Sequence, residues 1–159
     1  MGIASGEVVL GTIGSTVSKS FTVMGDIVNL ASRLEAVNKT FGTRVIIAES
    51  TLRLARQAVE SRELDQITVV GKTEPVRIYE LLCPAGQLKP EEAELLQEFA
   101  KGLVTYRGRE WDRAERHFQR CLKIGPKDAP SACYVERIAT LRKEPPPADW
   151  DGVWRFTHK

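Results

Sequence analysis

The residues most able to do chemistry in this sequence are Asn29 and Arg33, within the stretch F-T-V-M-G-D-I-V-N-L-A-S-R-L-E of residues 21–35. An arginine presents a planar fork of N–H donors that suits phosphate oxygens. Residues four apart are neighbours on the surface of a helix, so these two side chains would face the same partner. A single Asn or Arg usually lies on a solvated helix face. The surrounding elements decide whether this pair forms such a face or contacts phosphate.

An apolar stripe predicts the helix that carries the pair. Helical spacing relates six residues: Ile27, Leu30, Ala31, Leu34, Val37 and Phe41. Asp26 offers an N-cap, and Gly42 stands in the C′ position where helices commonly end. At about 100° per residue, Asn29 and Arg33 lie roughly opposite the stripe. The stripe therefore faces a core, and the pair faces something else.

Short apolar runs and turn residues predict a strand-rich first half. We expect strands at 7–10, 21–24, 44–48, 64–70 and 76–82, a Gly/Ser/Thr-rich loop at 11–20, and a short helix from residue 49 to about residue 59. Gly71 and Pro75 give the link between the last two strands the chemistry of a hairpin turn. The opening M-G-I-A-S-G-E-V-V-L-G enters a strand pattern at once, which is typical of the middle of a folded domain.

The composition shifts at residue 84. Residues 84–94 are expected to form a linker, and no strand pattern follows it until residue 142. Gly and Pro residues divide this part into predicted helices at 91–107, 110–124 and 129–142. Residues 144–159 form a tail rich in Pro and Trp, expected to be extended and packed by its aromatic side chains.

Composition also narrows the classes of function. The 159 residues are 42% hydrophobic and 28% charged, with 23 basic and 21 acidic residues and a net charge of +2. This small, dispersed excess gives no electrostatic argument for nucleic acid. No stretch approaches the ~20 apolar residues that span a membrane, so no membrane contact is expected from this chain. Cys83, Cys121 and Cys133 form no C-x-x-C pair and, with His117 and His158, no metal-ligand spacing, so we expect reduced thiols in the cytosol.

Three segments together resemble a known family. They are G-E-V-V-L-G-T-I-G-S, the gapless G-D-I-V-N-L-A-S-R-L-E of residues 25–35, and G-K-T-E-P-V-R-I-Y-E-L. Residues 1 to about 82 are similar to the C-terminal half of a class III adenylate/guanylate cyclase catalytic domain. The resemblance implies an α+β fold over residues 1–83, a partial ferredoxin-like nucleotide cyclase fold with a mixed, mainly antiparallel sheet.

The resemblance also implies roles for four residues. In this family the ribose 3′-hydroxyl of ATP or GTP attacks the α-phosphorus and pyrophosphate leaves. Arg33 matches the arginine that stabilises the transition state, and Asn29 matches the residue that positions the ribose. Thr22 matches a base-reading position, which favours adenine over guanine, although a β-branched residue is also common in a strand. Lys72 is a candidate for the triphosphate, with a solvated turn lysine as the alternative.

Metal ions and a partner are implied in the same way. The family binds two Mg²⁺ or Mn²⁺ ions through two aspartates on earlier strands, and this sequence begins after both; neither Asp26 nor Asp65 matches them. The site lies at an interface with a second cyclase domain, so we expect a homodimer. A partial sheet would expose strand edges, which favours oligomerisation or marginal solubility of the isolated chain.

The helical part resembles a single tetratricopeptide (TPR) repeat. Gly102, Trp111, Ala114, Phe118 and Pro126 fall at positions 8, 17, 20, 24 and 32 of that 34-residue pattern. One repeat is too short for a solenoid. Residues 95–143 are therefore expected either to pack on their own domain, which we favour, or to bind a protein partner.

Two functions follow from the sequence. The first is an adenylate cyclase in intracellular signalling that makes cAMP from ATP. This chain would supply Asn29 and Arg33 and, without the metal-binding aspartates, is expected to be inactive alone. The alternative is a catalytically inactive cyclase-like fragment that acts as a dimerisation or partner-binding module. We expect a cytoplasmic location, in a parent protein with or without a membrane anchor.

Overall fold

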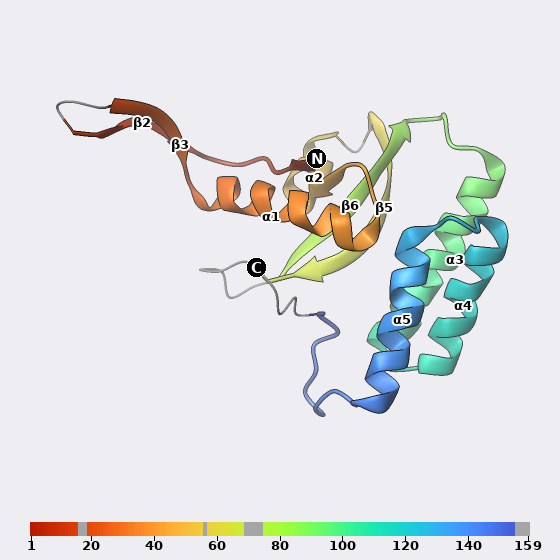
Figure 1. The fold of residues 1–159 in the computed structure, drawn as a ribbon. Helices are drawn as coiled ribbons and strands as arrows, with labels where there is room; N and C mark the ends of the chain where they lie inside the picture. The colour runs from red at the N-terminus through yellow and green to blue at the C-terminus, as the bar shows by residue number, and fades with distance from the viewer. Residues whose placement is uncertain (16–18, 56, 69–74, 155–159) are drawn as a thin grey trace.

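The computed structural model describes residues 1–15, 19–55, 57–68 and 75–154 of the chain. Figure 1 shows a sheet with α1 and α2 beside it, a two-stranded ribbon that projects from one end, and a group of three helices at the other end. In chain order the elements are β1 (Gly2–Ile3), β2 (Val9–Gly14), β3 (Lys19–Met24), α1 (Asp26–Phe41), β4 (Ile46–Ala48), α2 (Glu49–Ala55), β5 (Val59–Ile67), β6 (Val76–Pro84), α3 (Pro90–Arg107), α4 (Trp111–Ile124) and α5 (Ala129–Lys143).

The main sheet has the strand order β1-β4-β6-β5. β1 pairs in parallel with β4, whereas β4 with β6 and β5 with β6 are antiparallel. This arrangement confirms the predicted α+β class with a mixed, mainly antiparallel sheet. β5 and β6 pair as the predicted hairpin, although most of the link between them lies outside the described residues.

The ribbon of β2 and β3 corrects the expected loop at 11–20. In the described part, Gly11–Gly14 and Lys19–Ser20 are strand, and the pairing runs from Val9 opposite Met24 to Gly14 opposite Lys19. Glycine, serine and threonine suggested a loop, but cross-strand hydrogen bonds hold these residues extended, because strand formation depends strongly on pairing context. Most ribbon side chains are exposed, including Phe21 at 73%.

Helix α1 confirms the predicted stripe and its end. Four stripe residues are buried, namely Leu30, Leu34, Val37 and Phe41. Gly42 adopts φ 63°, the left-handed conformation that suits glycine at a helix end. The predicted cap was wrong: Gly25 is the N-cap, Asp26 is the first helical residue, and no side chain caps this end.

Long-range pairing moved the boundaries around β5. The predicted helix to about residue 59 ends at Ala55, and β5 begins at Val59 rather than at Leu64. Residues 59–63 pair with the far end of β6, which itself extends to Pro84. Pairing with a strand distant in sequence therefore makes residues 59–63 a strand, although these residues show no clear alternation of apolar and polar side chains.

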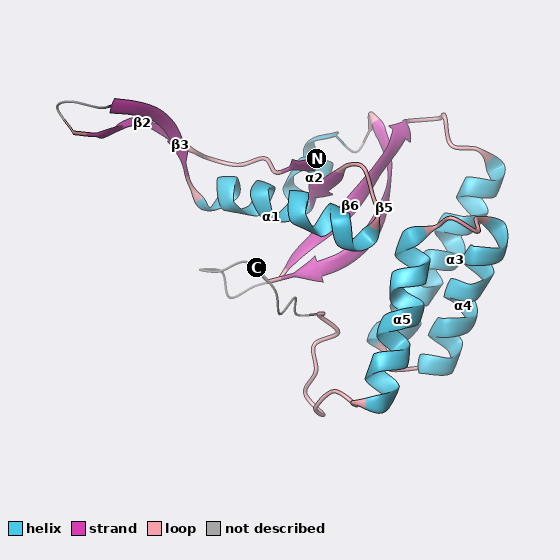
Figure 2. Cartoon of the chain, viewed as in Figure 1, coloured by secondary structure: helices cyan, strands magenta, loops and turns pink. Residues whose placement is uncertain are grey.

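The helical segment α3–α5 lies beside α1 and β5 (Figure 2). One apolar core continues from α1 and the strands into this segment. The three helices lie close to their predicted ranges. The Tyr134 hydroxyl donates to the carbonyl oxygen of Leu64, at a shift in the β5 register, with an O···O distance of 2.6 Å. One edge of the sheet is therefore covered, and the tail also packs, with Val153 buried.

Close packing between α3 and α4 leaves no room for a side chain at Gly102. A Cβ on Gly102 would lie 2.7 Å from the Phe118 ring, which is itself fully buried. Gly→Ala inside a helix normally stabilises by about 1 kcal/mol. Here we expect Gly102→Ala to destabilise by about 1–3 kcal/mol through overpacking. Urea denaturation measures the change, with Val104→Ala, at an exposed position of α3, as the control that stays within about 0.5 kcal/mol.

The carboxylate of Glu98, which lies among basic side chains of α3 and α4, predicts an acid-dependent loss of stability. Glu98 accepts a hydrogen bond from Lys101 Nζ at 2.6 Å, and His117 Nδ1 and Arg120 Nη1 lie 2.8 and 3.7 Å from its other oxygen. The hydrogen bonds from Lys101 and His117 lower the pKa of Glu98 from 4.5 to about 2. The stabilisation is therefore present above pH 4.5 and is lost as the pH falls towards 2.

Urea denaturation at pH 6 and pH 3 tests this coupling. Wild type should lose more unfolding free energy between the two pH values than Glu98→Gln, which cannot ionise at this position. Equal losses in the two proteins would show that Glu98 does not contribute.

Candidate functional site

Asn29 and Arg33 lie on the exposed face of α1, away from its buried stripe. The packing of Leu30 and Leu34 beside them fixes the rotation of the helix, so that both side chains point outwards. Arg33 Nη1 donates a long hydrogen bond of 3.5 Å to the carbonyl oxygen of Thr68, just beyond the end of β5. The structure therefore places the arginine beside the link between β5 and β6.

Thr22 lies in β3, half-buried, opposite Gly11 of β2. The chain passes from β3 into α1 through Gly25, whose φ of 147° is in the region that favours glycine. This turn joins the strand carrying Thr22 to the helix carrying Asn29 and Arg33. Lys72, the fourth candidate, lies outside the described residues.

A cleft of about 450 Å³ opens beside the first turns of α1. The N-terminal segment, α1, α2 and the start of β6 line it: Ser5, Gly6, Glu7, Asp26, Ile27, Leu30, Glu49, Ser50, Arg53, Pro75 and Val76. Neither Asn29 nor Arg33 belongs to this lining. No local sequence pattern indicates the cleft, because its residues come from four separate segments.

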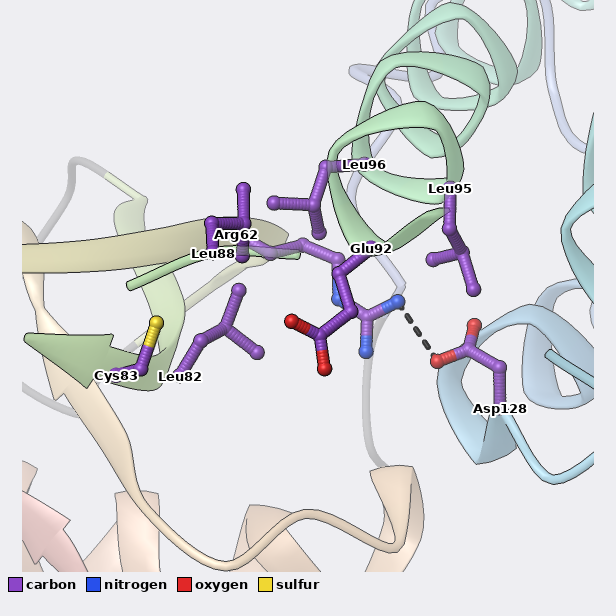
Figure 3. Close-up of a pocket in the computed structure, with 8 residues that line it drawn as sticks. All are labelled: Arg62, Leu82, Cys83, Leu88, Glu92, Leu95, Leu96 and Asp128. Atoms are coloured by element: carbon purple, nitrogen blue, oxygen red, sulfur yellow. Dashed lines mark hydrogen bonds and ion pairs between the residues drawn. The ribbon is translucent and has the colours of Figure 1, made fainter. Parts of the chain in front are cut away.

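A smaller pocket of about 190 Å³ lies between the end of β6 and the helical segment (Figure 3). Leucine side chains from β6, the linker and α3 form its apolar wall, and Arg62 and Asp128 are polar members. Arg62 is 7% exposed and its Nη1 lies 2.8 Å from Asp128 Oδ1. Its charge is therefore used in an ion pair that joins β5 to the start of α5.

Two further kinds of chemistry have little support in the described residues. There, no group of three or more His, Cys, Asp or Glu side chains is placed to hold a metal ion. The three cysteines are free, and burial raises the pKa of Cys121 to about 11, so this thiol stays protonated at neutral pH.

Among the described residues no helix has the length and apolar character to cross a bilayer.

Comparison with known proteins identifies the family. The model of the adenylate and guanylate cyclase catalytic domain matches residues 1–82, which include α1 and both strands of the ribbon. The chain belongs to this family.

Relatives with assigned names point to the same class. The terminal-differentiation-specific adenylate cyclase of Dictyostelium discoideum is 31% identical over 141 residues, 86% of this chain, so that match extends into the helical segment. An adenylate cyclase of Anabaena cylindrica is 40% identical over 84 residues, and adenylate cyclase 1 of Rhizobium meliloti is 36% identical over 92 residues, 51% and 58% of this chain. The chain spans only 7%, 17% and 14% of these relatives' lengths.

Solved cyclase structures are also similar to this chain. The adenylyl cyclase CyaB from P. aeruginosa is 31% identical, with a TM-score of 0.45 over 55% of this chain and 44% of that one. The guanylate cyclase domain of RhGC from Catenaria anguillulae, solved with GTP, is 26% identical, with a TM-score of 0.43 over 52% of this chain and 43% of that one.

Proposed function

We propose that this chain forms part of an adenylate cyclase that converts ATP to cAMP and diphosphate in cytoplasmic signalling. The observation that carries the proposal is the pair Asn29 and Arg33, exposed on one face of a well-packed helix within the segment that matches the family model. The relatives named as adenylate cyclases support the choice of ATP.

The proposed reaction is an internal displacement at phosphorus. The ribose 3′-hydroxyl of ATP gives up its proton to solvent, and its oxygen forms a bond to the α-phosphorus. The bond from that phosphorus to the bridging oxygen breaks, and diphosphate leaves with the electron pair. Negative charge builds on the phosphoryl oxygens in the transition state. We assign Arg33 to these oxygens, because its guanidinium can donate two parallel hydrogen bonds, and Asn29 to the ribose.

Base and triphosphate recognition are assigned to two further residues. The Thr22 hydroxyl can both donate and accept hydrogen bonds, which suits the edge of adenine. Lys72 is proposed for the triphosphate. Mg²⁺ or Mn²⁺ would bind the phosphates. We propose that the two aspartates implied by the family resemblance, outside this chain, hold these ions, and we assign no step to a metal held here.

The ribbon supports a dimeric site. Five of its large apolar side chains are exposed on the projecting arm: Val9 64%, Leu10 59%, Ile13 53%, Phe21 73% and Val23 42%. The pairing of β2 with β3 puts Leu10, Phe21 and Val23 on one face of the ribbon and Val9 and Ile13 on the other. Exposed apolar side chains grouped in this way usually mark an interaction site. We propose that a second cyclase domain covers the ribbon, and that the exposed Asn29 and Arg33 then meet groups from that partner across the same interface.

Replacing the arginine tests the catalytic role. Removing one preorganised donor from a developing oxyanion typically lowers kcat by about 10²–10³. We expect a loss of this size for Arg33→Ala and a similar direction for Asn29→Ala, measured as cAMP formed from ATP with Mn²⁺ by the parent protein. The chain alone, assayed beside it, is expected to be inactive, because the proposed metal ligands lie outside it. Lys39→Ala, at another exposed basic residue of α1, is the control and should retain activity.

The possible outcomes separate the two functions. If the parent protein is active and Arg33→Ala turns over normally, the proposed role of Arg33 is wrong. If neither preparation makes cAMP, the inactive dimerisation or partner-binding module replaces the enzyme.

The proposed dimer has its own test. Phe21→Asp places a charge at the most exposed aromatic position of the ribbon, and desolvating that charge should weaken self-association at least about tenfold, or 1.4 kcal/mol. Light scattering across a concentration series measures the change. Leu54→Asp on α2, where the side chain is 79% exposed, is the matched control. Equal association of both variants and wild type would exclude the ribbon as the interface.

A further inference from the structure

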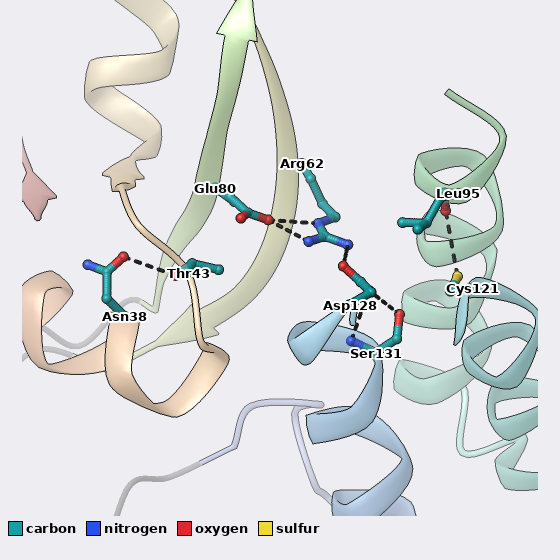
Figure 4. A network of polar contacts seen from close by, with 8 residues as sticks. All are labelled: Asn38, Thr43, Arg62, Glu80, Leu95, Cys121, Asp128 and Ser131. Carbon is teal, nitrogen blue, oxygen red and sulfur yellow. Dashed lines mark hydrogen bonds and ion pairs between the residues drawn. The ribbon is translucent and has the colours of Figure 1, made fainter. Parts of the chain in front are cut away.

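Helix α5 is held against both the helix and the sheet that carry the proposed site. Its first residue lies against the end of α1, since a Cβ on Gly42 would come within 2.6 Å of the Ala129 Cβ. Its N-cap Asp128 accepts from the Ser131 backbone N–H at 3.2 Å and binds Arg62 of β5, which also pairs with Glu80 of β6 (Figure 4). The start of α5 is therefore fixed to α1 and to both strands of the hairpin.

Two turns further along α5, Arg137 joins three parts of the molecule. This residue is 4% exposed, and its Nη1 donates to Asp65 Oδ2 of β5 at 2.6 Å, with Asp65 only 1% exposed. Its guanidinium also lies 4.9 Å from the centre of the Phe41 ring, the last residue of α1, and 4.9 Å from that of Trp154 in the tail. One side chain thus contacts α1, β5 and the C-terminal tail.

The contacts of Arg137 with α1 and β5 affect where the Arg33 guanidinium lies. Arg33 lies on α1 about two turns before Phe41, and its hydrogen-bond acceptor Thr68 lies three residues after Asp65. The position of the Arg33 guanidinium therefore depends on how α1 sits relative to β5. Arg137 contacts both elements, on α1 by stacking and on β5 by an ion pair.

We propose that Arg137 is a positioning residue for Arg33, so that the helical segment and its tail are part of the catalytic unit. This inference rests on the proposed function. A buried ion pair loses much of its attraction to desolvation and is often no more stabilising than an apolar pair of similar volume. What such a pair does provide is a fixed direction and distance, which a catalytic arginine requires.

The test uses a double variant that keeps the fold. Arg137→Met alone would leave the Asp65 carboxylate buried without its partner, so Asp65→Asn with Arg137→Met removes both charges together. Arg137→Lys keeps the charge opposite Asp65 but loses the planar group that lies over Phe41 and Trp154. The matched control is Glu63→Gln with Arg107→Met, which removes an ion pair of 2.7 Å between β5 and α3 whose two side chains are each 26% exposed.

Two measurements are made well below the melting temperature of each variant. Hydrogen exchange of the 159-residue chain should be at least tenfold faster at α1 amides in the double variant, intermediate in Arg137→Lys and unchanged in the control. In the preparation that makes cAMP, kcat should fall about tenfold in the double variant with KM unchanged, because substrate binding by other groups is retained.

The outcomes separate this inference from the proposed function. Unchanged exchange in α1 would overturn the coupling whatever the activity. Faster exchange with unchanged kcat, in a preparation where Arg33→Ala is impaired, would overturn the positioning role. If Arg33→Ala itself has no effect, the proposed function fails, and the positioning role fails with it. If the double variant does not fold, the exchange and kcat of Arg137→Lys decide the matter alone.

Discussion

The burial of one face of α1 is the constraint on which the candidate site depends. Leu30, Leu34 and Phe41 are at most 3% exposed, and burying each such side chain contributes roughly 1.5–3 kcal/mol. Rotating the helix far enough to bury Asn29 and Arg33 would expose this stripe and take polar groups out of water. The apolar term is much larger than the 0–1 kcal/mol typical of a surface ion pair, so the core, and not the polar groups themselves, decides where the pair points.

Polar contacts between segments distant in sequence fix how the helical segment is placed on the sheet. Arg62 links β5 to β6 and α5, and Arg137 links β5 to α5. Apolar packing alone tolerates sliding of a helix over a sheet, because hydrophobic contacts have no direction. The ion pairs have both distance and direction, so they select one placement of the helical segment among those that bury a similar apolar area. Aromatic rings surround them: Phe99 lies under Arg62 and Tyr134 beside Arg137.

The sequence predicted those features that short-range patterns determine. The stripe of α1, the turn at Gly42 and the three C-terminal helices follow from periodicity and from glycine and proline. The ribbon at 11–20 and the start of β5 did not, since their strand character comes from partner strands. Asn29 and Arg33 were placed on the exposed face correctly, whereas the Arg62 and Arg137 pairs joined residues about 18 to 72 positions apart and left no local signal. The cleft beside α1 was missed for the same reason.

The helical segment and the ribbon differ in how well their exposed edges and apolar side chains are covered. The helical segment covers the β5 end of the sheet, where the Tyr134 hydroxyl donates to the Leu64 carbonyl oxygen. Among the described residues the ribbon receives no such cover, and two strands alone are marginally stable in water. Consecutive apolar residues such as Val9 and Leu10 lie on opposite faces of the ribbon, so each face presents apolar side chains to whatever lies alongside. The proposed second domain would bury these side chains and complete the packing of the ribbon, so association would then add to the stability of this half of the molecule.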